Sequence, residues 1–291
     1  MVKKLSQLYL DARNAILTQE DAHTASLYAR NLLCAASERT WESIVSNGDI
    51  DAPEAVCSLM EQYVARILAG EPLAYVLGQW DFYGMVLTVN PDVLIPRDDT
   101  CAVTELAIET ALFLKNSPRI LDLCTGSGCI GLAIAKKVPD ARVTLADISD
   151  EALAIAKKNV TANKLLGRVS CIKADALTVP SKFLGKFEMI VSNPPYITAE
   201  QMRQLPDSVK NYEPELALYG GEDGLDFYRA ILKNYAPALQ PGGYICFEFG
   251  IGQGDDICKI AESEGYKIFK RAKDYNGIER ALVAQYSREE E

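Results

Sequence analysis

The sequence has 291 residues, of which 48% are hydrophobic and 24% charged, with a formal net charge of −10. The length suits one large domain or two of unequal size, and the composition is that of a globular protein, not a disordered or fibrous one. The net charge argues against a broad nucleic-acid-binding surface. Because Asp11 and Arg13 interrupt the N-terminal stretch and no run of about 18 apolar residues occurs, we expect neither a signal peptide nor a membrane span, and a cytoplasmic protein.

Eight cysteines are spread through the sequence without a CxxC pair, and His23 is the single histidine. A zinc site needs clustered thiolate or imidazole ligands, so no metal site is predicted. A chain of this length also has no need of a disulfide framework. The cysteines are predicted to be reduced and mostly buried.

Residues 1–72 are predicted to form a small helical domain. Asp51 followed by Glu54 is a candidate capping box, and Gly70 marks the end of the apolar-faced helix that starts there. Three weaker patterns of helical period precede it, at 5–18, 21–36 and 39–46. These segments together predict a bundle.

Residues 73–95 are predicted to be a β-hairpin that links the bundle to a second domain, residues 96–291. This segment is rich in β-branched and aromatic residues, and Gly78, Gly84 and Asn90-Pro91 supply turn signals.

The second domain alternates strands with helices. Strands are predicted at 119–124, 142–147, 169–173, 187–192 and 243–249. Helices are predicted at 101–115, 128–137, 150–163, 224–238 and 253–264. Continuous apolar strands separated by helices predict a doubly wound, mostly parallel sheet of the Rossmann-like α/β kind. The segments 266–271 and 280–286 flank an Asn-Gly turn, which predicts an antiparallel hairpin at the sheet edge.

A glycine-rich loop follows the first strand of this domain and opens a helix. Gly126, Gly128 and Gly131 satisfy the GxGxxG pattern, and Asp147 ends the next strand. Glycines let the backbone approach a ligand closely, and a carboxylate at that strand end can accept both hydroxyls of a ribose. The pattern predicts a cofactor with an adenosine group but does not distinguish NAD from others.

Asp122 separates these alternatives. This carboxylate lies inside the strand, two residues before the loop, where it would repel a pyrophosphate but attract an amino group or a sulfonium. S-adenosylmethionine carries both cations, so the residues favour a methyl donor over NAD.

The stretch "IVSNPPYI" ends the fourth strand and offers a grip for a substrate –NH2 group. Pro194 and Pro195 fix the backbone, which can hold the Asn193 amide oxygen and the Pro194 carbonyl pointing the same way. Two acceptors on one –NH2 group direct the nitrogen lone pair towards the methyl donor. Tyr196 offers a flat face for a planar substrate group.

Several motifs in order resemble the HemK/PrmC family of peptide chain release factor N5-glutamine methyltransferases. They are "EPLAYVLGQWDFYGMVLTVNPDVLIPR", "ILDLCTGSGCIGLAIA", "IVSNPPYI", "YEPELALYGGEDGLDFYR" and "FEFGIGQ". The resemblance covers roughly residues 70–286, with the helical part agreeing in kind more than in motif. It implies a class I methyltransferase fold, with the helical domain docking the release factor.

The resemblance also implies roles for individual residues. The residues that would bind S-adenosylmethionine are Arg97, Asp122, Cys124, Thr125, Gly126, Ser127, Gly128, Asp147, Asp175, Ala176 and Asn193. The substrate glutamine would lie against Asn193, Pro194, Pro195 and Tyr196, of which Asn193, Pro194 and Tyr196 would serve catalysis. No metal is implied.

The sequence departs from the family pattern in three places, two single residues and one short segment. Cys124 begins the glycine loop where the family usually has glycine, and residues 98–101 read Asp-Asp-Thr-Cys in place of Pro-Glu-Thr-Glu. Ala176 stands where many members have a bulky residue against adenine. None of these changes removes a proposed reacting group.

Three alternatives stay open. A glutamine methyltransferase acting on a ribosomal protein would share the core motifs. Methylation of adenine N6 in DNA or RNA would need base flipping and phosphate tracking, which the acidic composition disfavours. A protein that only binds S-adenosylmethionine or a release factor would not need Asn193 and Tyr196.

Overall fold

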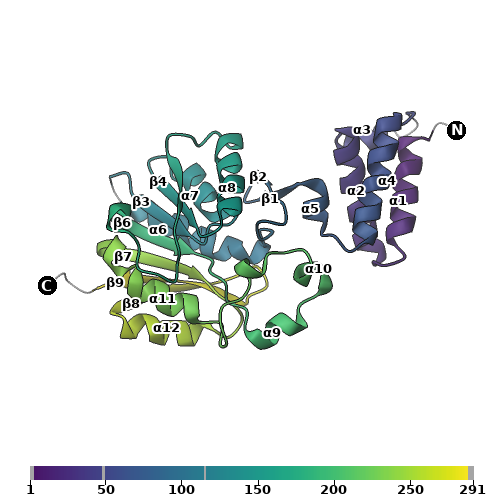
Figure 1. Ribbon diagram of the computed structural model, residues 1–291. Coiled ribbons are helices and arrows are strands. Elements are labelled where there is room, and N and C mark those ends of the chain that lie inside the picture. Colours follow the sequence, from purple (N-terminus) through teal and green to yellow (C-terminus); the bar gives the residue numbers. More distant parts are fainter. Residues whose placement is uncertain (1–2, 48–49, 115, 288–291) are drawn as a thin grey trace. The chain divides into compact units, whose positions relative to one another are not determined.

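The computed structural model describes residues 3–47, 50–114 and 116–287 (Figure 1). The chain divides into two compact units. One comprises Met1–Gly78 with Asp207–Tyr212, and the other comprises Gln79–Pro206 with Glu213–Glu291.

The first unit is helical. Its helices are α1 (Leu5–Ile16), α2 (Ala22–Ser37), α3 (Trp41–Ser46), α4 (Glu54–Leu68), α5 (Leu73–Leu77) and α10 (Asp207–Lys210). Helices α1, α2 and α4 lie side by side in Figure 1. Buried residues that recur at helical spacing, such as Leu5, Leu8 and Ala12 on α1, form the bundle core. Asp21 caps α2 by accepting hydrogen bonds from the backbone of His23 and Thr24.

The predicted capping box at Asp51 and Glu54 is wrong. Helix α4 begins at Glu54 with Pro53 in the N-cap position, and no side chain caps it. Asp51 lies too far from the helix start and instead pairs with Lys4, 2.5 Å from carboxylate oxygen to Nζ.

Residues 73–77 form helix α5, although the sequence predicts a hairpin there. The guanidinium of Arg66 on α4 donates to the carbonyls of Tyr75 and Val76 at 2.9 and 3.0 Å, which ties this turn to the bundle. Gly78, with φ of 69°, ends the helix. The hairpin is therefore shorter than predicted and consists of β1 (Gln79–Phe82) and β2 (Met85–Thr88) in the second unit.

The second unit contains a seven-stranded sheet with the order β5-β4-β3-β6-β7-β9-β8. The strands are β3 (Arg119–Leu123), β4 (Arg142–Asp147), β5 (Val169–Lys173), β6 (Phe187–Ser192), β7 (Leu239–Glu248), β8 (Tyr266–Lys273) and β9 (Glu279–Tyr286). Five strands run parallel, and β9 pairs antiparallel with both β7 and β8. The predicted Rossmann-like sheet with an antiparallel edge hairpin is confirmed.

Helices cover both faces of the sheet. On one face, α6 (Cys101–Phe113), α7 (Cys129–Lys137) and α8 (Asp150–Ala162) enclose one apolar cluster together with Ile120 and Cys246. On the other face, α11 (Asp226–Asn234) and α12 (Gly254–Ser263) enclose a second cluster (Figure 1). The short helix α9 (Ala199–Gln204) follows β6. The strands are buried from both sides, as their continuous apolar runs require.

The winding of the sheet reverses between β3 and β6. The register pairs Leu123 with Ser192, and the Ser192 hydroxyl donates to the Leu123 carbonyl at 2.6 Å. The loops that follow these two strands therefore start side by side. This is the switch point at which open α/β sheets bind ligands.

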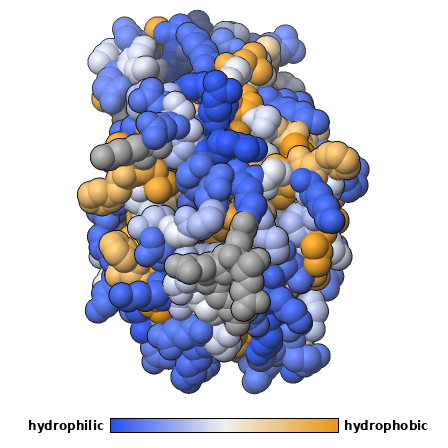
Figure 2. Space-filling model, turned by 90° about the vertical axis from the view of Figure 1, so that its left-hand side faces the viewer, coloured by the Kyte–Doolittle hydropathy of each residue, from blue (hydrophilic) through white to orange (hydrophobic). Residues whose placement is uncertain are grey.

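Neither the helices nor the face shown in Figure 2 marks out a long apolar segment in the described part of the chain. Within the described ranges, no helix is long and apolar enough to cross a bilayer. On the face shown in Figure 2, hydrophobic residues are scattered among hydrophilic ones. Scattered apolar residues of this kind are usual on protein surfaces.

Candidate active site

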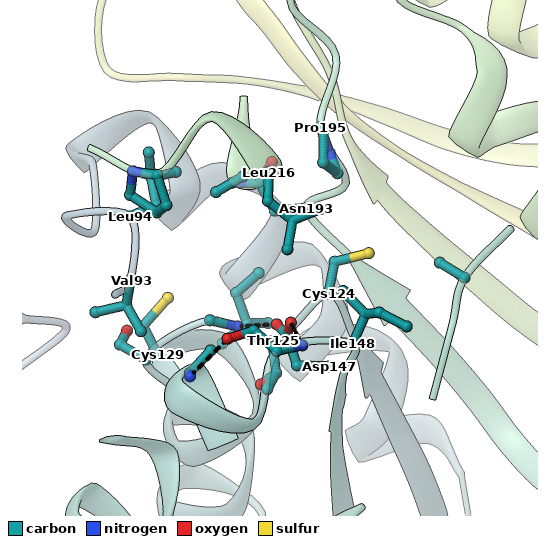
Figure 3. A pocket seen from close by; sticks show the side chains of 18 of the residues that line it. Val93, Leu94, Cys124, Thr125, Cys129, Asp147, Ile148, Asn193, Pro195 and Leu216 are labelled. Atoms are coloured by element: carbon teal, nitrogen blue, oxygen red, sulfur yellow. Dashed lines mark hydrogen bonds between the residues drawn. The ribbon is translucent and has the colours of Figure 1, made fainter. Parts of the chain in front are cut away.

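A cavity of about 320 Å³ opens at the switch point, entirely within the second unit. Figure 3 shows its wall, with Asn193 and Pro195 at the top, Val93 and Leu94 at one side, and Cys124, Thr125 and Asp147 below. We call the loop Cys124–Gly128 with Asp147 the cofactor wall, and Asn193–Tyr196 the acceptor wall. The volume lies in the range of small-molecule sites.

The cofactor wall is held in place by hydrogen bonds from its own backbone. The Thr125 amide donates to the Ala146 carbonyl at 3.0 Å, and the Gly126 amide donates to the Asp147 carboxylate at 2.9 Å. Gly128 has φ of 86°, which favours glycine because it has no Cβ. The loop thus runs tightly from β3 into α7, as the glycine pattern predicts.

Asp122 lies behind this loop and does not line the cavity. Its carboxylate, in a residue only 1% exposed, accepts hydrogen bonds from the Thr125 hydroxyl at 2.6 Å and the Gly131 amide at 2.9 Å. Burial raises the pKa of the Asp122 carboxyl to about 7. The side chain supports the loop, and its second oxygen has no partner among the described residues.

Asp147 presents its carboxylate to the cavity at the end of β4. One oxygen accepts from the Gly126 amide and the other from the Ser149 amide at 3.0 Å. Burial raises the pKa of this carboxyl. Each oxygen keeps a lone pair, so the group can still accept hydrogen bonds from two ribose hydroxyls.

Asp175 and Ala176 line the same cavity beyond β5. The Asp175 carboxylate accepts from the Leu177 amide at 2.8 Å. The backbone carbonyl of Asp175 accepts from the Tyr235 hydroxyl at 2.9 Å. Ala176 is 4% exposed and packs against the apolar cluster beneath α11. A small residue here leaves room for a flat ring.

The acceptor wall brings Asn193 and Pro195 to the cavity, whereas Pro194 is buried and Tyr196 lies outside the lining. The Asn193 amide nitrogen donates to the Thr100 hydroxyl at 3.4 Å, a long hydrogen bond. Its amide oxygen is the atom left for a ligand. Burial raises the pKa of Tyr196, so this phenol stays neutral.

Two later motifs brace the acceptor wall. The Gln253 amide donates to the carbonyl of Tyr196 at 3.1 Å, and the Gly220 amide donates to the Ile197 carbonyl at 2.9 Å. A Cβ on Gly220 would lie 2.6 Å from the Pro195 carbonyl oxygen. The "YGGEDG" and "FGIGQ" segments therefore have a structural purpose, which is to fix the backbone after Asn193.

The Arg97 side chain contacts another loop of the same chain and does not line the cavity. Its guanidinium forms an ion pair with the Glu213 carboxylate, which also accepts from the Ile95 amide at 3.2 Å. Glu213 is 6% exposed. Because Pro96 and Pro214 both line the cavity, this pair fastens together the two loops that form one side of it.

The predicted site residues separate into two sets. Those that line the cavity are Cys124, Thr125, Gly126, Ser127, Asp147, Asp175, Ala176, Asn193 and Pro195. Those that do not are Arg97, Asp122, Gly128, Pro194 and Tyr196. The residues of the second set lie behind or beside the lining of the cavity.

Sequence reasoning missed several residues of the site. The apolar residues Val93, Leu94, Ile148, Leu216 and Phe227 line the cavity, but nothing in their local pattern marks them. Two carboxylates near the site, Glu213 and Glu248, are buried in the structure. For Glu248 the sequence holds a signal that could have revealed it. Glu248 lies in the apolar strand "ICFEF" as Asp122 lies in "ILDLC".

The cysteines and potential metal ligands fit no metal centre. All eight cysteines are free thiols. In the described part of the chain, no three His, Cys, Asp or Glu side chains gather in a way that could hold a metal ion. Burial raises the pKa of Cys124 and of Cys129, both on the cavity wall, so these thiols are protonated and poor nucleophiles.

Comparison with known proteins identifies the family. The methyltransferase small domain family matches residues 102–207, and the PrmC N-terminal domain family matches residues 10–78. A release factor glutamine methyltransferase of Clostridium acetobutylicum is 37% identical over 83% of this chain and 84% of its own. One from Geobacter sulfurreducens is 37% identical over 94% of both chains.

The fold has solved counterparts. A methyltransferase from Pyrococcus furiosus superposes with a TM-score of 0.52 at 19% identity, covering 78% of this chain and 100% of its own. The predicted HemK/PrmC resemblance is confirmed by the relatives, and with it the enzyme class, an S-adenosylmethionine-dependent methyltransferase. This chain belongs to the release factor glutamine methyltransferase family.

Proposed function

We propose that this protein transfers a methyl group from S-adenosylmethionine to the side-chain amide nitrogen (N5) of the glutamine in the Gly-Gly-Gln motif of peptide chain release factors. The names of its relatives support this target. The observation that carries the proposal is that Asn193 and Pro195 share one cavity with the glycine loop and Asp147.

Amide methylation requires that the nitrogen be made more reactive. The lone pair of an amide nitrogen is delocalised, so the acceptor wall must turn it towards the methyl group and stabilise the positive charge that develops. The Asn193 oxygen can accept from one N–H, because its own amide nitrogen is engaged with Thr100. We assign the second acceptor to the Pro194 carbonyl, whose peptide geometry the following proline restricts.

The cofactor wall suits the methyl donor. S-adenosylmethionine supplies an electrophilic methyl group on a sulfonium when bound. Asp147 would accept from its ribose hydroxyls, and Asp175 with Ala176 would lie by its adenine. Thr125, Gly126 and Ser127 would contact it through the loop, which Asp122 and Gly128 hold in shape. Arg97 and Tyr196 would act on the surrounding loops.

The remaining expectations follow from this target. The first unit would dock the release factor, since the PrmC N-terminal domain family matches there. We propose a cytoplasmic enzyme that needs no metal and has no stable affinity for nucleic acid or membranes. The net charge of −10 supports the absence of nucleic-acid binding.

Labelled S-adenosylmethionine tests the assignment. We expect tritium on a purified release factor and none on its Gly-Gly-Ala variant, on a ribosomal protein or on a duplex oligonucleotide. Label on the oligonucleotide alone would identify an adenine methyltransferase, and label on the ribosomal protein alone would identify that class as the target.

Asn193→Ala distinguishes an enzyme from a protein that only binds its ligands. We expect this variant to bind S-adenosylmethionine with nearly unchanged affinity while methyl transfer falls roughly 100-fold or more. The control is Asn276→Ala, since Asn276 is exposed in the turn between β8 and β9. Full transfer by Asn193→Ala would contradict the proposed role.

A further inference from the structure

A second buried carboxylate lies at the acceptor wall. Glu248 is the last residue of β7 and is 1% exposed. Parallel pairing of Ser192 with Phe247 places it beside Asn193, one step further along both strands. Burying a carboxylate is costly unless it is paired or hydrogen-bonded, so its presence needs a reason.

Glu248 forms no ion pair with any cation that the structure describes. Arg280 on β9, the cation that lowers its pKa, is already bonded to Asp99 at 2.7 Å and to Asp274 at 3.1 Å. One Glu248 oxygen, Oε2, has no hydrogen-bond partner among the described residues.

The groups that do interact with Glu248 belong to the site. Thr100 and Asn193, whose N–H and O–H groups can donate to a carboxylate, both lower the pKa of the Glu248 carboxyl against the effect of its burial. Thr100 is 2% exposed, lines the cavity and receives the Asn193 amide nitrogen at 3.4 Å. Asn193 is thus bonded to Thr100 and lies next to Glu248 by the strand register, and both Asn193 and Thr100 line the cavity, where Figure 3 shows Asn193.

We propose that Glu248 is a positioning residue for methyl transfer, acting through Asn193 and Thr100. Its carboxylate accepts from the Asn193 amide N–H, which fixes the amide with its oxygen towards the substrate nitrogen. It also raises the electron density on that oxygen, which then stabilises the positive charge developing on the substrate nitrogen. This proposal rests on the proposed function.

A dependence of rate on pH follows. Burial raises the pKa of the Glu248 carboxyl to about 7, with Asp99 raising it further and Arg280 lowering it. The other titratable groups facing it are Tyr196, Tyr228, Cys101 and Cys129, and burial raises the pKa of each. They stay neutral near pH 7, so Glu248 is the group of this set that changes charge there. The maximal rate should rise as pH passes through about 7 and the carboxylate forms.

Glu248→Gln is the decisive variant, since it keeps the shape and removes the charge. We expect kcat for the release factor to fall roughly 10- to 100-fold, with the dissociation constant for S-adenosylmethionine unchanged. The rise of kcat between about pH 6 and pH 8 should disappear. The control is Glu262→Gln on the exposed side of α12, which should keep the wild-type rate and pH profile.

Thr100 supplies an independent check in case the Glu248 variant folds poorly. Thr100→Ser keeps the hydroxyl and should retain kcat, whereas Thr100→Val should lower it. Equal rates for the two Thr100 variants, or a wild-type pH profile in a folded Glu248→Gln protein, would overturn the inference while leaving the proposed function intact. Failure of the wild-type enzyme to label any release factor would overturn both.

Discussion

Behind each wall of the cavity lies the same unusual feature, a buried carboxylate near the end of a strand that pairs in parallel. Asp122 on β3 supports the cofactor wall, and Glu248 on β7 lies behind the acceptor wall. Each is 1% exposed, each has a pKa raised to about 7, and each has one oxygen without a partner among the described residues.

Their partners differ in distance along the chain. Asp122 accepts from groups three and nine residues away, inside one strand–loop–helix unit. Glu248 depends on Thr100 and Asn193, which are 93 residues apart and reach it only when β6, β7 and the start of α6 have assembled. The cofactor wall is thus a local structure, whereas the acceptor wall is a product of the whole sheet.

Gly220 offers a way to disturb the acceptor wall without the cofactor wall. In Gly220→Ala the new Cβ would lie 2.6 Å from both the Pro195 carbonyl oxygen and the Tyr196 Cα, so the backbone after Asn193 must shift. We expect kcat to fall roughly 100-fold, with the dissociation constant for S-adenosylmethionine within about threefold of wild type. Single-turnover transfer and calorimetry measure the two.

Gly167→Ala is the matched control for a general loss of stability. Gly167 is exposed with φ of 90° and has open space around its Cα, so alanine there brings strain without a clash. It should keep kcat. If Gly220→Ala lost cofactor affinity and turnover equally, a shift of the acceptor wall would also disturb the cofactor wall, contrary to the prediction.

Asp122→Asn should change how the free energy of unfolding depends on pH. The folded pKa of about 7 lies above the ordinary value of 3.8. Between these values the folded protein holds a proton that the unfolded chain has lost, so stability falls as pH rises through this window. The asparagine variant lacks this titration and should lose less stability from about pH 4.5 to pH 7.5, by roughly 2 kcal/mol or more.

Urea unfolding of the apo protein across this range measures the slope. Glu248 also has a raised pKa, but it titrates in both proteins, so its contribution to the pH dependence of stability cancels in the difference between them. Parallel curves for wild type and Asp122→Asn would mean that Asp122 is ionised in the folded protein throughout.

Asp147→Asn probes the ligand-facing side of the cofactor wall. The asparagine amide keeps one oxygen acceptor and has an NH2 donor in place of the other. That donor would face the N–H of either Gly126 or Ser149, and it could no longer accept from a ribose hydroxyl. Affinity for S-adenosylmethionine should fall roughly 10-fold, while kcat at saturating cofactor changes little. Asp140→Asn, at an exposed position, is the control. A loss of kcat with unchanged affinity would place Asp147 at the chemistry instead.

Much of the second unit could be predicted because its signals are local. Strands β4, β5 and β6 have the predicted bounds, since each is a short apolar run between helical patterns. The prediction failed where a side-chain contact accompanies the structure. Residues 73–77 form a helix whose carbonyls accept from Arg66 on α4, and the pattern of apolar residues does not indicate that contact.

The site divides in the same way. The cavity-lining residues of the glycine loop and Asp147 were found by pattern, because the turn itself demands those residues. Arg97 was predicted to contact the cofactor, but its side chain pairs with Glu213, 116 residues along the chain, which no local pattern indicated. A sequence pattern can identify a polar residue that matters, but only the folded chain shows which group it pairs with.

Cys124 should have the smallest effect, and it tests how far the cofactor wall depends on its own backbone. Its φ of 60° is the left-handed conformation that glycine adopts freely. Cys124→Gly relieves this strain but loses the thiol packing against the cluster beneath α11 and adds freedom to the unfolded chain. Cys124→Ala loses the same packing and keeps the strain.

The glycine variant should therefore be more stable than the alanine variant by about 1 kcal/mol and within about 1 kcal/mol of wild type. Cofactor affinity should change less than about threefold in both, because the Thr125 and Gly126 amides hold the loop independently of this side chain. Thermal unfolding and calorimetry of the three proteins measure these differences. A large loss of affinity in Cys124→Gly would show that the thiol itself, and not the turn, contacts the methyl donor.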